Sequence, residues 1–163
     1  MLLTDIQADT RERFAAAVTA HRHAMYRAAR VLLDSDADAE DAVGEAILRA
    51  WQSFGRLREE RALKSWLLRI TVNCAYAHHR KEARVTYTDD LEPLAGGAED
   101  PHDLGLWDAV CRLPEEQRIV TVLFYYEDMP TAAIAKTLGV REGTVRSRLS
   151  RARDRLRTLL KED

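Results

Sequence analysis

Residues 131–157 read TAAIAKTLGVREGTVRSRLSRARDRLR and form the most informative stretch of the chain. They predict two helices joined by a tight turn. Thr131 can cap the first helix, and Gly139 stands where the end of a helix favours a left-handed residue. Apolar side chains recur at helical spacing along the second helix, from about Glu142: Val145, Leu149, Ala152, Leu156 and Leu159. The pattern indicates a helix-turn-helix whose second helix suits the major groove of DNA.

The outward face of that second helix is basic. Residues 141–157 contain seven arginines against two acids. Ser147 and Ser150 fall opposite the apolar side chains, flanked by Arg146 and Arg151. Arginine holds phosphate and can pair with guanine through two hydrogen bonds. A solvated basic face on an ordinary helical hairpin is the alternative, but the glycine turn and the small hydroxyl residues favour a DNA-binding helix.

Charge is segregated along the chain. The net charge of the 163 residues is only −2, yet residues 34–45 hold six acids and no base, and residues 86–103 hold six acids and no Lys or Arg. Residues 56–84 hold eight bases against three acids. Surfaces of opposite sign indicate more than one partner.

The composition bounds the class of protein. With 46% hydrophobic and 32% charged residues, the chain is expected to fold. Its two cysteines, Cys74 and Cys111, indicate a reducing compartment. No apolar run is long enough to span a membrane, and the N-terminus lacks the apolar core of a signal peptide. We therefore expect a soluble, cytoplasmic protein with no membrane insertion.

The hydrophobic periodicity predicts an all-α fold of two small helical domains joined by a flexible acidic linker. A helical bundle is expected over residues 1–84, the linker over residues 85–105, and the helix-turn-helix domain over residues 106–163. Pro and Gly with many acids mark the linker. The expected helices before the helix-turn-helix cover about residues 7–33, 38–54, 63–84 and 115–126.

The second expected helix has an acidic outer face that contains one apolar residue. Its buried stripe is predicted to comprise Ala39, Val43, Ala46, Ile47, Ala50, Trp51 and Phe54. Leu48 falls outside that stripe, among Asp41, Glu45 and Gln52. An apolar side chain amid acids is typical of a protein-binding surface. A single exposed leucine with no role is the alternative.

One strip of the third expected helix combines aromatic, basic and amide side chains. Its members are Trp66, Arg69, Asn73, Tyr76, Ala77, Arg80 and Arg84. Such a strip suits single-stranded nucleic acid, because rings stack on bases, arginines hold phosphates and an amide can bond a base edge. The alternative is that the two rings pack in the core and the arginines are merely solvated.

Cysteine and histidine offer a weaker hypothesis of a metal site. Cys74 and His78 are four residues apart on one helix, and His79 and Cys111 could complete a set of ligands. No CxxC or HExxH pattern supports such a site, and Cys74 fits the apolar face of its helix. A buried structural cysteine is therefore favoured, and no metal or other cofactor is expected.

Four motifs in order resemble the extracytoplasmic-function group of bacterial sigma factors. They are DAEDAVGEAILRAW at 38–51, SWLLRITVNCAYAHHR at 65–80, LPEEQRIV at 113–120 and IAKTLGVREGTVRSRLSRARDRLR at 134–157. The resemblance covers nearly the whole chain and implies the two domains that the family calls regions 2 and 4. It implies a transcription initiation factor that is not an enzyme.

The resemblance also implies roles for individual residues. Docking on the clamp coiled coil of core RNA polymerase would involve Asp41, Glu45, Leu48 and Gln52. Recognition and melting of the promoter −10 element would involve Trp66, Arg69, Asn73, Tyr76 and Arg80. Recognition of the −35 element would involve Arg146, Ser147, Ser150 and Arg151, with Thr144 and Arg148 on phosphates. This chain departs from the family pattern at three positions. Many members carry Gln at the position of Gly44 and Asp or Asn at the position of Ala77. Ala133 stands where the family usually has an acid.

Three expected partners and two alternative functions complete the sequence-based expectations. The resemblance implies core RNA polymerase and promoter DNA as partners. It also implies an anti-sigma factor, because the family is commonly controlled by one. The free chain is expected to be a monomer. A stand-alone helix-turn-helix repressor would explain the C-terminal half but leaves the strip at 66–84 unused, and it predicts a dimer on a palindrome. A metal hydrolase using Cys74, His78 and His79 lacks both a nucleophile constellation and a phosphate loop.

Overall fold

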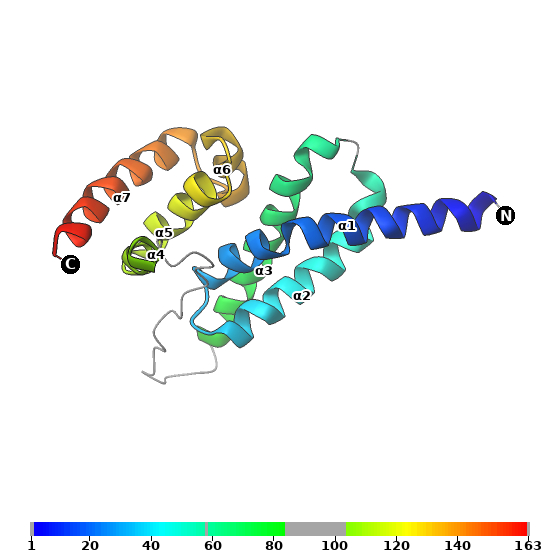
Figure 1. The fold of residues 1–163 in the computed structure, drawn as a ribbon, viewed down its shortest axis with the longest axis horizontal. Coiled ribbons are helices and arrows are strands. Elements are labelled where there is room, and N and C mark those ends of the chain that lie inside the picture. Colours follow the sequence, from blue (N-terminus) through cyan, green and yellow to red (C-terminus); the bar gives the residue numbers. More distant parts are fainter. Residues whose placement is uncertain (1, 58, 84–103, 163) are drawn as a thin grey trace.

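The structure is a computed structural model that describes residues 2–57, 59–83 and 104–162. Within these ranges every regular element is helical and no strand occurs, which confirms the predicted all-α class. Figure 1 shows two groups of helices, an N-terminal unit (residues 2–83) and a C-terminal unit (residues 104–162). Residues 84–103, which hold nearly all of the expected linker, lie outside the described part of the chain.

Three long helices build the N-terminal unit. They are α1 (Leu2–Arg30), α2 (Asp36–Ser53) and α3 (Leu63–Ala83), with short 3-10 turns at Phe54–Arg56 (η1) and Glu60–Ala62 (η2). Each of the three helices packs against the other two. Apolar residues at helical spacing turn inward and form the core, in which the fully buried side chains include Met25, Ala28, Ala46, Leu67, Leu68 and Val72.

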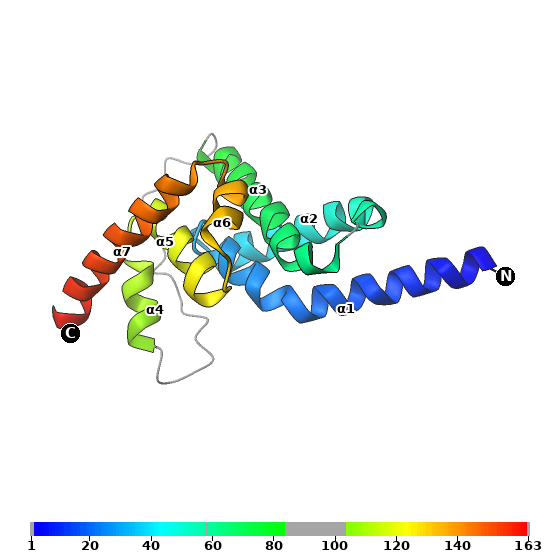
Figure 2. The ribbon, with the colours of Figure 1, turned by 90° about the horizontal axis from the view of Figure 1, so that it is seen from above.

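Helix α1 begins and ends earlier than the predicted range of 7–33. Its first turns extend beyond the bundle, as Figures 1 and 2 show, and expose Leu2, Leu3 and Ile6. It ends at Arg30 because the next three residues turn into the core, where Leu33 is buried. The Arg30 guanidinium donates to the Leu33 carbonyl at 2.7 Å and so satisfies the backbone of this turn.

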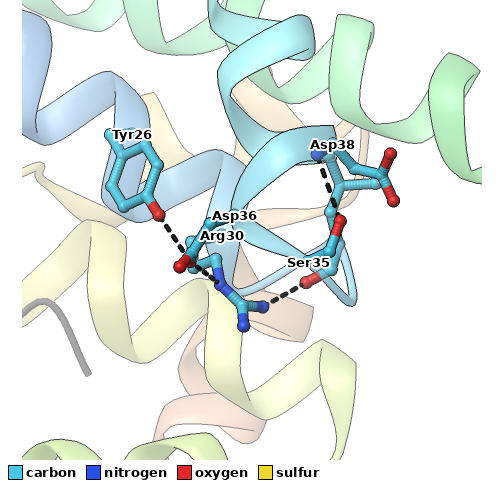
Figure 3. Close-up of polar contacts among 6 residues, drawn as sticks. Tyr26, Arg30, Ser35, Asp36 and Asp38 are labelled. Atoms are coloured by element: carbon cyan, nitrogen blue, oxygen red, sulfur yellow. Dashed lines mark hydrogen bonds and ion pairs between the residues drawn. The ribbon is translucent and has the colours of Figure 1, made fainter. Parts of the chain in front are cut away.

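The connection between α1 and α2 is held by a small polar network (Figure 3). Asp36 Oδ1 accepts hydrogen bonds from the Tyr26 hydroxyl at 2.6 Å and from Arg30 Nε at 2.8 Å. The Ser35 hydroxyl caps α2 by accepting from the Asp38 amide at 3.1 Å. Burial, followed by the bond to Asp36, raises the pKa of Tyr26 to about 12. The bonds from Tyr26 and Arg30 lower the pKa of Asp36.

The prediction that Trp51 is buried was wrong. Its side chain remains 42% exposed at the surface of the N-terminal unit. One side of the indole packs on Phe14, with ring centroids 5.1 Å apart, and Phe14 in turn packs on Phe54 at 5.1 Å. Phe14, which is buried, thus covers one side of the indole, and the other side of Trp51 faces solvent.

Four helices and a π-helical turn build the C-terminal unit. They are α4 (Leu104–Cys111), α5 (Glu115–Thr121), the π turn η3 (Val122–Tyr126), α6 (Thr131–Leu138) and α7 (Glu142–Glu162). Pro114 precedes α5, where a missing amide proton costs nothing. Trp107 is buried in this unit and packs edge-on against Tyr126 at 5.3 Å.

Helices α6 and α7 form the predicted helix-turn-helix. Gly139 ends α6 with φ of 67°, a left-handed conformation that glycine adopts without strain, as expected. The predicted cap was wrong, because Pro130 occupies the N-cap and Thr131 is the first helical residue. The Thr131 hydroxyl instead donates to Glu142 Oε1 at 2.8 Å. It thereby ties the start of α6 to the start of α7.

The two units are in direct contact. Helix α6 packs against α3, and η3 approaches α1. Figure 2 shows the C-terminal unit lying beside α3, so α3 has neighbours from both units. This leaves one side of α3 facing solvent.

Candidate nucleic-acid and polymerase interface

The outward face of α7 carries the residues that the sequence assigned to the −35 element. Arg146, Ser147, Ser150 and Arg151 are exposed, while Thr144 and Arg148 are partly buried. The opposite face of the helix is buried and includes Val145, Leu149, Ala152 and Leu156. A rigid core-packed helix therefore presents hydroxyls and guanidinium groups together, which suits contact with base edges and phosphates.

Local contacts pre-position part of this face. Arg146 pairs with Glu142 at 2.9 Å, one turn earlier in α7, and the Ser147 hydroxyl donates to the Thr144 carbonyl at 3.0 Å. Arg148 pairs with Glu116 of α5 at 3.3 Å. Arg151 is exposed, and within the described residues it has no hydrogen-bond or ion-pair partner.

The solvent-facing strip of α3 is formed by Arg69, Asn73 and Arg80, all of them exposed. Within the described ranges none of these three side chains has a hydrogen-bond or ion-pair partner. Their spacing along α3 places them in a row on one side of the helix. The row offers two cationic groups and one amide, which can hold phosphates and bond a base edge.

The two aromatic members of the strip are partly buried. Trp66 and Tyr76 both pack against the core, and the Trp66 ring lies 6.4 Å from that of Phe54. Burial raises the pKa of Tyr76. The charges of Glu115 and Glu116 raise it further, and the charge of Arg148 partly opposes the rise. The rings thus combine the two alternatives that the sequence left open, because each contacts the core and still keeps some exposed surface.

The acidic outer face of α2 holds the residues assigned to polymerase docking. Asp41, Glu45, Leu48 and Gln52 are exposed, and Leu48 leaves 65% of its surface in water. Arg49 also lies on this side and pairs with Glu45 at 2.6 Å. The patch is therefore an apolar residue surrounded by polar groups, an arrangement typical of a protein-binding surface.

A hollow in the C-terminal unit was not foreseen from the sequence. It encloses about 290 Å³ and has an almost entirely apolar lining. The lining includes Leu106, Val110, Tyr125, Leu156 and Leu160, with Arg153 and Arg157 among the other residues. Because α4, η3 and α7 contribute to it from distant parts of the chain, spacing within any one helix carries no signal of it.

The cysteines and histidines in the described part of the chain do not converge on one site. Cys74 is buried, as predicted for a structural cysteine, and burial raises its pKa and that of Cys111, the latter to about 11. His78 Nε2 lies 3.1 Å from Asp38 Oδ1. Among the described residues, no three His, Cys, Asp or Glu side chains are grouped as metal ligands. In the same part of the chain, no helix has the length and apolar content needed to cross a membrane.

Comparison with known families matches both units. Residues 17–85 match Sigma-70 region 2, and residues 104–156 match Sigma-70 region 4. The ECF RNA polymerase sigma factor SigM of Mycobacterium tuberculosis is 38% identical over 143 residues, which cover 86% of this chain and 73% of SigM. The RNA polymerase sigma factor SigV of Bacillus subtilis is 34% identical over 150 residues, 90% of each chain.

Solved structures agree with these matches. The sigma factor RpoE of Bartonella quintana, in complex with the anti-sigma factor NepR, has a TM-score of 0.74 and 28% identity, and the match covers 93% of this chain and 99% of that one. CnrH, in complex with the cytosolic domain of CnrY, shares the fold with a TM-score of 0.64 at 24% identity, covering 94% of this chain and 90% of CnrH. The chain therefore belongs to the extracytoplasmic-function sigma factors, which are transcription initiation factors and not enzymes.

Proposed function

We propose that this sigma factor binds core RNA polymerase and directs it to promoters by reading two separate DNA elements. Residues 1–84 would serve as the domain for polymerase docking and the −10 element. Residues 106–163 would serve as the domain for the −35 element, with residues 85–105 as the connection between them. The family membership supports this division, and the three exposed faces described above supply one surface for each task.

Polymerase docking is assigned to the outer face of α2. Asp41, Glu45 and Gln52 would contact polar groups of the clamp coiled coil around Leu48 as an apolar anchor. The 65% exposure of Leu48 supports this role, because an apolar side chain gains most from a partner when water surrounds it in the free protein.

The −10 element is assigned to the strip on α3. Asn73 would bond a base edge, Arg69 and Arg80 would hold the backbone, and Trp66 and Tyr76 would support the separated strand with their exposed edges. The absence of any partner for Arg69, Asn73 and Arg80 within the described residues supports the assignment. Within the described part of the chain, no internal bond would have to be broken to recruit these groups.

The −35 element is assigned to α7. Arg146, Ser147, Ser150 and Arg151 would face base edges in the major groove, while Thr144 and Arg148 would contact phosphates. The single observation that carries the proposed function is that one chain of this family presents a basic strip with an amide on α3 and a basic face with hydroxyls on α7. A protein that reads two separate DNA elements needs two such faces, and here one lies on each unit.

Regulation by an anti-sigma factor and action in the cytoplasm, as a monomer when free, are part of the proposal. The similarity to RpoE, which was solved with the anti-sigma factor NepR, supports the first point. The cytoplasm follows from the need to meet RNA polymerase. No identity is assigned to the anti-sigma factor.

Run-off transcription with core RNA polymerase tests the proposed function. The template is a pool of genomic promoters from the same organism, transcribed with and without this protein. We expect new, defined start sites that are lost with Asn73→Ala and with Arg146→Ala. Lys81→Ala on α3 and Arg155→Ala on α7 are the matched controls, because both side chains are exposed and outside the assigned faces.

Two results would contradict the proposal. Start sites that persist in both site variants would remove the assigned roles of Asn73 and Arg146. Absence of new start sites, together with nanomolar binding to a palindromic duplex by a dimer, would favour a repressor that works without polymerase.

A further inference from the structure

A buried carboxylate joins the two units. Glu127 belongs to the C-terminal unit, just after η3, and its side chain is only 1% exposed. Its Oε1 lies 2.7 Å from Nε of Arg27 in α1, and its Oε2 lies 3.3 Å from Nζ of Lys64 in α3. Both cations belong to the N-terminal unit, so the two ion pairs exist only while the units are in contact.

The burial of Glu127 makes these pairs strong determinants of the arrangement. A charge that leaves water must be paired, or the loss of hydration is not offset. The side chains of Arg27 and Lys64 are 26% and 34% exposed, whereas that of Glu127 is 1% exposed. Water is therefore excluded mainly from the carboxylate. Separation of the units would return Glu127 to water, whereas removal of its charge would weaken the contact without opening a cavity.

The backbone around Glu127 fixes the direction of its side chain. Its amide donates to the Val122 carbonyl at 3.1 Å and thus closes the π turn. Asp128 follows with φ of 54°, a left-handed conformation that is uncommon outside glycine, and the Met129 amide donates to Leu123 at 3.0 Å. The turn therefore holds the carboxylate in place from the C-terminal unit.

The same contact brings together helices assigned to different promoter elements. Helix α3, which carries the −10 strip, packs against α6 of the helix-turn-helix that contains the −35 helix. The two elements occupy separate positions along the duplex, so the surfaces that read them must be separated as well. The α3 strip and the helix-turn-helix cannot serve both elements while α3 and α6 remain packed together.

We infer that Glu127, clamped between Arg27 and Lys64, is the latch of a closed conformation that must open before the chain can engage polymerase and both promoter elements. The effect of closure on binding to polymerase and promoters rests on the proposed function. The closed conformation itself can be measured in the free protein. It assigns a regulatory contact to residues that lie outside the docking and DNA-binding faces.

Small-angle X-ray scattering of the free, full-length chain is the first test. Glu127→Gln keeps the shape of the side chain and removes its charge. We expect it to shift the closed-to-open ratio by roughly 10-fold to 100-fold and to increase the radius of gyration. Asp154→Asn is the matched control, because it removes the same charge from an exposed pair with Arg157 within α7. It should scatter like the wild type.

Affinity for core polymerase is the second readout. If closure competes with docking, Glu127→Gln should bind core polymerase more tightly than the wild type by up to the same factor. Hydrogen exchange should also be faster along the side of α3 that faces α6. Arg27→Gln and Lys64→Gln provide independent routes to the open form from the N-terminal unit. These two variants test the inference if circular dichroism shows that Glu127→Gln does not fold.

Three outcomes would overturn the inference. The first is a folded Glu127→Gln variant, or folded Arg27→Gln and Lys64→Gln variants, with an unchanged radius of gyration. The second is a wild-type chain that is already as expanded as the variants. The third is expansion of the variants without tighter binding, although the wild type binds polymerase. If neither wild type nor variants bind polymerase, the proposed function fails, while scattering still reports separately on the closed conformation.

Discussion

The hydroxyl of Tyr26 and the carboxylate of Asp36 meet at 2.6 Å across the connection between α1 and α2, and Arg30 binds the same oxygen. The two bonds lower the pKa of Asp36, so the folded chain favours its ionised form. A carboxylate with a lowered pKa contributes stability above the pKa it has in the unfolded chain. That contribution is lost as the pH falls through the lowered, folded value.

Asp36→Asn should therefore flatten the acid limb of the stability profile. We expect the variant to lose less stability than the wild type between neutral pH and the acidic range, because the linked proton is no longer taken up on unfolding. Urea unfolding followed by circular dichroism at several pH values measures this difference. Asp34→Asn, at an exposed position outside the Tyr26–Arg30–Asp36 network, is the control. Parallel acid limbs for wild type and Asp36→Asn would refute the prediction.

Two glycines should respond to alanine with opposite signs. Gly139→Ala should destabilise the chain by about 1 kcal/mol, because φ of 67° strains any residue with a Cβ atom. Gly44→Ala should stabilise it by about 0.5–1 kcal/mol, since Gly44 lies within α2 and an added Cβ would meet nothing within 4 Å. Chemical denaturation gives both values, and equal signs would contradict the prediction.

Leu48→Ala should separate docking from folding. Because Leu48 is exposed, the free energy of unfolding should change by no more than about 0.5 kcal/mol. If Leu48 anchors the α2 face, affinity for core polymerase should fall at least about fivefold. Ile6→Ala is the control, since Ile6 is also an exposed apolar residue but lies on the projecting part of α1. An equal loss in both variants would argue against a docking role for Leu48.

Arg146 and Arg148 should behave differently toward DNA. Arg146→Ala should lose about 1–3 kcal/mol of discrimination at one or two base pairs of the −35 element. Arg148→Ala should weaken binding to all sequences alike and reduce the salt slope by about one, as expected for a phosphate contact. Binding of holoenzyme to −35 variants over a range of salt concentrations distinguishes them. Uniform weakening by Arg146→Ala would show that it holds phosphate.

Much of this molecule could be predicted from local patterns. Gly139 and the apolar spacing of Val145 and Leu149 sufficed for the helix-turn-helix, because a turn and an amphipathic helix are encoded within a few residues. The exposed positions of Leu48 and Asn73 followed from helical periodicity in the same way. Such features depend little on which distant helix completes the core.

Features that depend on distant neighbours were missed. Glu127 reads as an acid in a surface turn, and its partners Arg27 and Lys64 are far away in the sequence. Trp51 was predicted to be buried, but it packs only one side of its ring on Phe14 of another helix and stays exposed on the other. Thr131 bonds Glu142 of the next helix and does not cap its own. In each case a tertiary contact prevailed over a local preference.

The three tryptophans lie at three depths, and this gives the chain an internal optical reporter. Trp107 is buried in the C-terminal unit, Trp51 is 42% exposed, and Trp66 is a partly buried member of the α3 strip. A dissolved quencher therefore reaches Trp51 readily and Trp107 hardly at all. A nucleotide stacked on Trp66 would quench that indole and lower the total tryptophan emission, so strand capture could be followed in real time without a dye.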